Sequence, residues 1–157
     1  MSEMEMEREE PVEETDLPTA LKRLLADEIA MYLMAAGFHW NVEGINFQQF
    51  HDFFGAIYAD VYSSIDPTAE NIRKLGGYAP FMLPTLEKLR EIPDDSVSPS
   101  AADMVRALAN ANNVLIEDID ECFQLAQRDN EQGIADFLAA RDDMHKKWRW
   151  QLEATMK

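Results

Sequence analysis

The segment from His39 to Gly77 constrains this 157-residue chain more than any other part of its sequence. Two of the three histidines, His39 and His51, lie at its start, and two acids, Asp66 and Glu70, follow four residues apart. Imidazole nitrogens combined with carboxylate oxygens form a ligand set that suits iron, zinc or manganese. The four side chains are therefore candidate metal ligands.

The helical pattern places these candidates far apart within one chain. Gly44 and two asparagines interrupt the pattern between the histidines, and apolar residues then recur every three or four positions, at Phe47, Phe50, Phe54, Ile57, Val61 and Ile65. Fifteen helical residues separate His51 from Asp66, which at about 1.5 Å per residue is roughly 22 Å. If all four side chains share one metal, the acids must come from a second subunit related by a two-fold axis. The motif therefore predicts a homo-oligomer built from dimers.

The remaining periodicity predicts an all-α fold. We expect long helices over 17–39, 47–75, 100–127 and 131–155, with a short helix over 84–90 in the proline-containing connection between the second and third long helices. A long crossover of this kind joins parallel neighbours in a four-helix bundle. Pro67 lies inside the second helix, where it removes a backbone donor and is expected to kink the helix and displace Asp66.

The chain divides into a tail and one domain. Residues 1–16 contain many acids and the single base Arg8, so we predict a disordered acidic tail. Residues 17–157 are expected to form the bundle domain. No Glu-x-x-His sequence occurs, which disfavours a di-iron centre inside one chain; Asp142 with His145 comes nearest to it, and we expect His145 on the surface near a helix end.

Three parts of the sequence together resemble the Dps family of mini-ferritins. They are H-W-N-V-x-G from His39, the histidine twelve residues later, and D-x-x-x-E-x-I-R-x-L-G-G from Asp66. The resemblance continues in residues 21–27 and around Trp148, so it covers nearly all of the chain after about residue 16. It implies a ferritin-like four-helix bundle, a twelve-subunit shell, and oxidation of ferrous iron by hydrogen peroxide or oxygen with storage of the ferric product inside.

The resemblance also implies roles for individual residues. The catalytic iron ligands would be His39 and His51 of one subunit with Asp66 and Glu70 of its partner. Trp40 and Tyr58 are candidate electron donors, although an interfacial tryptophan and a core-edge tyrosine are equally good explanations. Iron would enter through an acidic three-fold pore. Its candidates are Asp129, Glu131 and Asp136, which would otherwise form an ordinary solvated helix start.

One position departs from the family pattern. Many members carry an acid four residues after the second histidine, whereas this chain has Gly55, so its second iron position lacks a ligand. Asp52 or Asp60 could compensate through water. A catalytically weakened shell that binds metal or serves as a structural cage is therefore the alternative to an active ferroxidase.

Charge and composition narrow the function further. A net charge of −16 repels polyanions, so nucleic-acid binding is disfavoured even though it is half of the Dps family's name. The single cysteine, Cys122, permits no intrachain disulfide and suits a reducing cytoplasm. No apolar run is long enough to span a bilayer, and the acidic N-terminus argues against a signal peptide.

Overall fold

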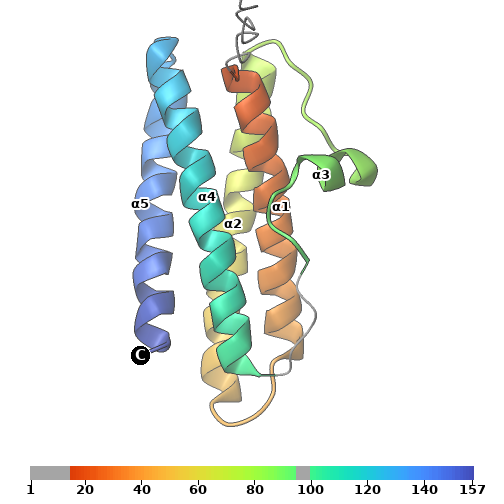
Figure 1. The fold of residues 1–157 in the computed structure, drawn as a ribbon, viewed down its shortest axis with the longest axis vertical. Coiled ribbons are helices and arrows are strands. Elements are labelled where there is room, and N and C mark those ends of the chain that lie inside the picture. The colour runs from red at the N-terminus through yellow and green to blue at the C-terminus, as the bar shows by residue number, and fades with distance from the viewer. Residues whose placement is uncertain (1–14, 95–99) are drawn as a thin grey trace, which may run out of the picture.

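Four long helices and one short helix make up the part of the chain that the structure describes, residues 15–94 and 100–157 of a computed structural model. The predicted tail lies almost entirely outside the described residues. No strand occurs in these two ranges, as predicted. The helices are α1 (Leu17–Asn41), α2 (Phe47–Lys74), α3 (Leu83–Leu89), α4 (Ala101–Arg128) and α5 (Gln132–Thr155) (Figure 1).

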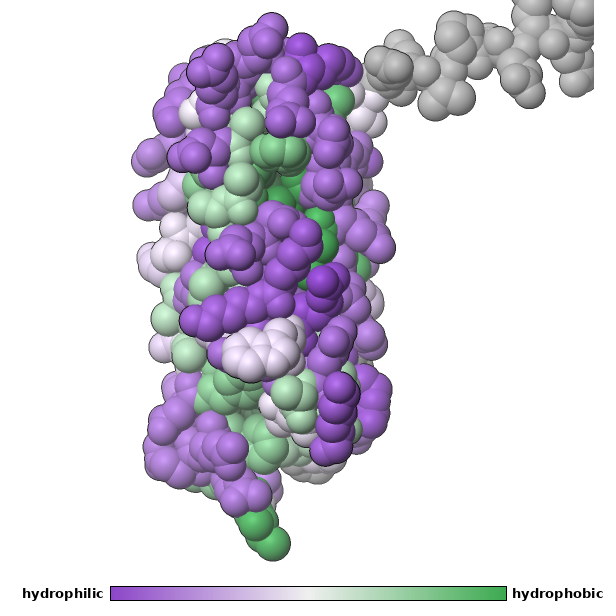
Figure 2. Space-filling model, turned by 90° about the vertical axis from the view of Figure 1, so that its left-hand side faces the viewer, coloured by the Kyte–Doolittle hydropathy of each residue, from purple (hydrophilic) through white to green (hydrophobic). Residues whose placement is uncertain are grey.

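The long helices lie side by side as a bundle. α1 packs against α2 and α4, and α4 packs against α5, while α3 stands outside the bundle beside α1 (Figure 1). Between them lies a continuous apolar core that includes Leu21, Leu24, Met31, Phe54, Ile57, Leu108, Leu115 and Leu152. The α5 side of the bundle is mostly hydrophilic, with apolar side chains showing along the middle of its upper half and near its lower end (Figure 2). None of the described helices combines the length and the apolar character that a membrane crossing requires.

Local signals in the sequence fix where the helices begin and end. Asp16 caps α1 by accepting a hydrogen bond from the Thr19 N–H at 2.9 Å. Gly76, with φ of 90°, follows the last turn of α2 in a left-handed conformation that favours glycine. α2 runs through Pro67 without a break. The buried residues Thr68 and Ile72 follow the proline, and their packing holds the last turns in place.

The connection between α2 and α4 is anchored to α1 by one carboxylate. Oδ1 of Asp27 accepts hydrogen bonds from the main-chain N–H groups of Glu91, at 2.8 Å, and Ile92, at 2.9 Å. Asp27 is completely buried, so these bonds are shielded from water. They hold the returning chain against α1 and thereby position α3 next to it.

Candidate metal centre

His39 and His51 lie face to face across the turn between α1 and α2. Their rings stack with centroids 3.7 Å apart and an interplanar angle of 14°. Nδ1 of His39 lies 2.5 Å from the main-chain oxygen of His51, and Nδ1 of His51 lies 2.7 Å from the main-chain oxygen of His39. A carbonyl oxygen can only accept, so each Nδ1 carries the proton that it donates.

This reciprocal bonding leaves Nε2 of each ring as the atom with a free lone pair. Neither Nε2 has a hydrogen-bond partner among residues 15–94 and 100–157. Metal-binding histidines typically donate their other ring N–H to a carbonyl or carboxylate, which fixes the tautomer and the ring orientation. The pair therefore presents two oriented nitrogen donors.

Gly55 provides the space that the His39 ring occupies. A Cβ atom at this position would lie 2.9 Å from Nδ1 and 3.0 Å from Cε1 of His39. Such contacts are closer than a carbon atom tolerates without movement of the ring. Gly55 thus both removes the acid that the family usually has and leaves room for the His39 ring.

The two acids suggested as substitutes for that missing ligand are already engaged. Asp52 is exposed and accepts a hydrogen bond from Gln48 at 2.9 Å. Both carboxylate oxygens of Asp60 are bound by Arg141 at 2.9 Å, and Trp148 Nε1 donates to one of them at 2.7 Å. The suggestion that Asp60 compensates for Gly55 is therefore wrong, because its oxygens are held by α5.

Asp66 and Glu70 lie one helical turn apart on an exposed face of α2. Neither carboxylate has a hydrogen-bond partner among the described residues. Because α2 is continuous from His51 past Glu70, the separation of the two pairs stays at roughly 22 Å along the helix axis. The structure thus brings the histidines together and the acids together, but it keeps the two pairs apart within one subunit.

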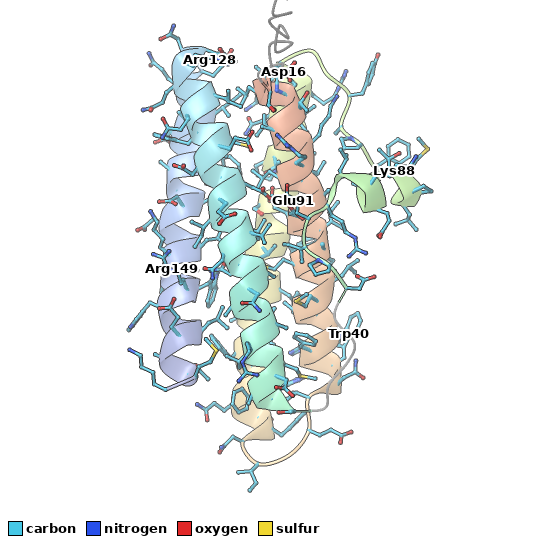
Figure 3. The ribbon with its side chains drawn as sticks, in the orientation of Figure 1. Asp16, Trp40, Lys88, Glu91, Arg128 and Arg149 are labelled. Carbon is cyan, nitrogen blue, oxygen red and sulfur yellow. The ribbon has the colours of Figure 1, made fainter. Side chains whose placement is uncertain are left out.

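An aromatic series leads away from the histidines. The Tyr58 ring lies 5.3 Å from the His39 ring and 6.0 Å from the Tyr32 ring, and Tyr32 lies 5.3 Å from Tyr62. Trp40 points outward near the end of α1, with 69% of its surface exposed (Figure 3). Of the two candidate electron donors, Tyr58 is therefore the one in contact with a candidate ligand.

The candidate pore acids surround the turn between α4 and α5. Asp129 is exposed and forms an ion pair with Arg128 at 2.9 Å. Glu131 immediately precedes α5, and Asp136 is exposed near its start. Asn130 makes the turn with φ of 57°. The three acids are thus gathered at one end of the bundle.

His145 is not the surface residue that the sequence suggested. It is completely buried, its Nδ1 donates to Asn112 Oδ1 at 2.8 Å, and its Nε2 accepts from Arg141 at 2.8 Å. Burial, reinforced by the charge of Arg141, lowers the pKa of His145 to about 3, so the ring is neutral. The sequence could have predicted this burial, because His145 lies on the apolar stripe of α5, seven residues after Leu138 and three before Trp148.

Buried acids form a second group that the sequence analysis did not single out. Glu28 is 2% exposed and accepts a hydrogen bond from Ser64. Burial raises the pKa of Glu28 to about 7, against the opposing effect of the hydrogen bond from Ser64. Asp27 and Asp118 are also buried. All three interrupt apolar helical stripes, which is the pattern that could have revealed them.

Comparison with known proteins places this geometry in context. A family model described as a ferritin-like domain matches residues 19–157. A Brevibacillus brevis protein named DNA protection during starvation protein is 30% identical over 134 residues, which cover 85% of this chain and 90% of the relative.

Solved structures agree with that match. A Dps protein from Vibrio cholerae, described as a member of a broad superfamily of ferritin-like diiron-carboxylate proteins, gives a TM-score of 0.87 at 26% identity, covering 90% of this chain and 89% of that one. A Dps protein from Bacillus brevis gives a TM-score of 0.85 at 28% identity, covering 90% and 95%. The predicted all-α, ferritin-like bundle is confirmed.

Proposed function

The chain belongs to the Dps family of ferritin-like proteins, and we propose that it is an iron-binding mini-ferritin that oxidises ferrous iron at sites shared between two subunits. The observation that carries this proposal is the reciprocal hydrogen bonding of His39 and His51. It leaves both Nε2 atoms as oriented donors, with no partner that explains them among the described residues.

Each proposed site is completed by Asp66 and Glu70 of the partner subunit. Carboxylate oxygens are hard, anionic ligands that favour the ferric product over the ferrous substrate, and neutral imidazoles adjust the affinity. The substrate iron therefore meets nitrogen from one subunit and oxygen from the other. Hydrogen peroxide or oxygen accepts the electrons, and the ferric product is stored inside a twelve-subunit shell.

Exposed apolar side chains around α3 support association through this face. Tyr78, Phe81 and Leu83 are 80%, 81% and 76% exposed, and Leu33 on the neighbouring face of α1 is 55% exposed. Leu33 and Leu83 line one hollow between α1 and α3. Large apolar side chains that gather on a protein surface often mark association sites. A two-fold contact here would bring a second copy against α1, whose last turn carries His39.

The candidate donors and pore acids fit this scheme. Tyr58, in ring contact with His39, is placed to donate an electron when a single iron is bound, and Trp40 is the second candidate. Asp129, Glu131 and Asp136 would lower the barrier for cations at a three-fold opening. The ion pair of Asp129 with Arg128 makes Asp136 the strongest of these candidates.

A weakened cage is the alternative function, and Gly55 is the observation that favours it. The family's usual acid is absent, and Asp60 does not replace it because Arg141 holds both of its carboxylate oxygens. Such a shell would bind iron but oxidise it slowly.

Anaerobic titration with ferrous iron, followed by a pulse of hydrogen peroxide and near-ultraviolet detection of ferric product, distinguishes these functions. The test variant is Glu70→Ala, and the matched control is Glu117→Ala, an exposed acid on α4. We expect rapid ferric formation in the wild type and the control, with a large loss in Glu70→Ala. Iron that is bound but oxidised no faster than in buffer would identify the weakened cage.

A further inference from the structure

Three carboxylates from separate elements converge at a place remote from the histidines in the sequence. They belong to Asp27 on α1, Asp118 on α4 and Glu91 in the connection after α3, and one oxygen of each lies within 4.8 Å of the others. Figure 3 shows Glu91 where the connection passes over α1. Asp27 is completely buried and Asp118 is 8% exposed, whereas Glu91 faces solvent. The cluster therefore has a closed base and an open side.

Two buried oxygens of this cluster lack a partner. The two main-chain N–H groups of the connection fix Oδ1 of Asp27, and Oδ2 of the same residue is left over. Oδ2 of Asp27 and Oδ2 of Asp118 are both buried without a hydrogen bond from the described residues. Buried carboxylate oxygens are nearly always satisfied, and leaving one unsatisfied costs about 1–3 kcal/mol or more. A proton shared between the two carboxyl groups, or a cation bound between them, can satisfy both oxygens.

The spacing of the oxygens fits a cation. Two oxygens on opposite sides of a cation are separated by twice the metal–oxygen distance, about 4.2 Å for Mg²⁺ and about 4.8 Å for Ca²⁺. A set of oxygen donors alone selects hard divalent ions, and Mg²⁺ prefers to keep several waters in a regular octahedron. We propose that Asp27, Asp118 and Glu91 bind a hard divalent cation, Ca²⁺ or Mn²⁺, at a site separate from the histidine pair.

A proton takes the place of the cation when none is bound. Burial is the largest of the effects that raise the pKa of Asp118 to about 9, and the neighbouring acids Asp27, Glu91 and Glu121 act in the same direction. At neutral pH Asp118 is then a protonated acid next to the Asp27 carboxylate. The bound cation links α1 and α4 to the connection that carries α3.

Mn²⁺ binding followed by electron paramagnetic resonance tests this site in the full-length assembly. The test variant is Asp118→Asn, whose amide reproduces the protonated acid and can donate to Asp27, so the fold is preserved. The matched control is Asp120→Asn, an exposed acid two residues further along α4. We expect Asp118→Asn to lose one Mn²⁺ per subunit that the wild type and the control retain. Ca²⁺, which binds imidazole poorly, should displace the same ion.

Glu91→Gln provides a second variant, because its main-chain N–H still anchors Asp27 while the charged side chain is lost. It should weaken the Ca²⁺-displaceable Mn²⁺ binding and reduce the rise in melting temperature that Mn²⁺ produces. Equal Mn²⁺ counts in the wild type and Asp118→Asn, with none displaced by Ca²⁺, would overturn the proposal. That result would leave the iron site unaffected, because the iron site is tested by Glu70→Ala.

Discussion

The histidine pair shows how single residues can depend on each other's main chain. Each ring is oriented by the carbonyl group of the other residue, so the pair forms only when the end of α1 and the start of α2 are correctly joined. Stacking of the rings at 3.7 Å also restricts their movement. Any neighbour that shifts one ring therefore disturbs both potential ligands.

Gly55→Ala should lower metal affinity at this pair. The new methyl group would lie 2.9 Å from Nδ1 of His39, so the ring must move and weaken its bond to the His51 carbonyl. We expect Zn²⁺ or Fe²⁺ binding to fall by about tenfold, of the order seen when the orienting partner of a ligand is lost. Isothermal titration of the anaerobic protein measures the change.

Gly133→Ala is the matched control, because a Cβ there meets nothing within 4 Å and the residue also lies in a helix. Gly55→Ala, in the interior of α2, should gain about 0.5–1 kcal/mol of helix propensity, and the contact with His39 opposes that gain. Unchanged affinity in Gly55→Ala would mean that the His39 ring is free to move without loss of its ligand geometry.

Glu28→Gln should make stability less sensitive to pH. The folded pKa of Glu28 is raised to about 7 by burial, above the ordinary 4.5, so its stabilising contribution is complete below pH 4.5 and is lost as pH rises through 7. Glutamine does not titrate and still accepts the Ser64 hydrogen bond. Free energies of unfolding of the wild type and variant, measured by urea unfolding from pH 4 to 8, should diverge in favour of the variant, by on the order of 2–3 kcal/mol. Parallel curves would show that Glu28 titrates normally.

At the scale of helices, the sequence predicts most of what the structure contains. The short helix expected over 84–90 is observed at Leu83–Leu89, and the long helices begin and end within about two residues of their predicted limits. Caps, prolines and glycines act locally, so local sequence is sufficient for them. The buried network of Asp60, Arg141 and His145 was not predicted, because Asp60 lies 81 residues before Arg141 and meets it only in the folded bundle.

Asp60→Asn should destabilise the contact between α2 and α5. Burial raises the pKa of Asp60, but the bonds from Arg141 and Trp148 outweigh this effect and lower it overall, so the stabilising contribution of the pair is complete above the ordinary pKa of 3.8 and is lost as pH falls through the lower folded pKa. Removing the charge leaves Arg141, with 11% of its side chain exposed, without its ion-pair partner. We expect a loss of about 3–5 kcal/mol, measured by urea unfolding at pH 7.

A double variant separates the two explanations for that loss. Asp60→Leu with Arg141→Met removes both charges, and replacing a buried pair by apolar groups is often neutral. Recovery of most of the stability would attribute the effect to the uncompensated arginine. A double variant as unstable as Asp60→Asn would instead attribute it to the lost bonds of Trp148 and His145.

At the scale of the whole molecule, the continuous helix α2 keeps the two histidines and the two acids of one subunit apart. The sequence alone was sufficient to predict the division, because fifteen residues of continuous helix keep His51 and Asp66 roughly 22 Å apart. The sequence could not specify which surfaces of two subunits meet. That depends on the exposed apolar side chains around α3 and on the position of α3 itself, which two hydrogen bonds to the distant Asp27 determine.

Mixed assemblies provide the sharpest test of a shared site. His39→Ala and Glu70→Ala should each abolish rapid iron oxidation, because each removes one side of every site. In a dimer that contains one subunit of each kind, one site carries both defects and the other carries none. Random pairing makes half of the dimers mixed, so co-expression should restore about a quarter of wild-type activity.

The matched control is co-expression of His39→Ala with His51→Ala, which places both defects on the nitrogen side. Every site in that assembly lacks one histidine, whichever subunits pair, so no activity should return. Stopped-flow measurement of ferric formation at equal protein concentration compares the two mixtures. If neither mixture recovers, the histidines and the acids do not complete one site across a two-fold axis. Recovery in the first mixture alone requires that His39 and Glu70 act together from different subunits, because no single chain in it contains both.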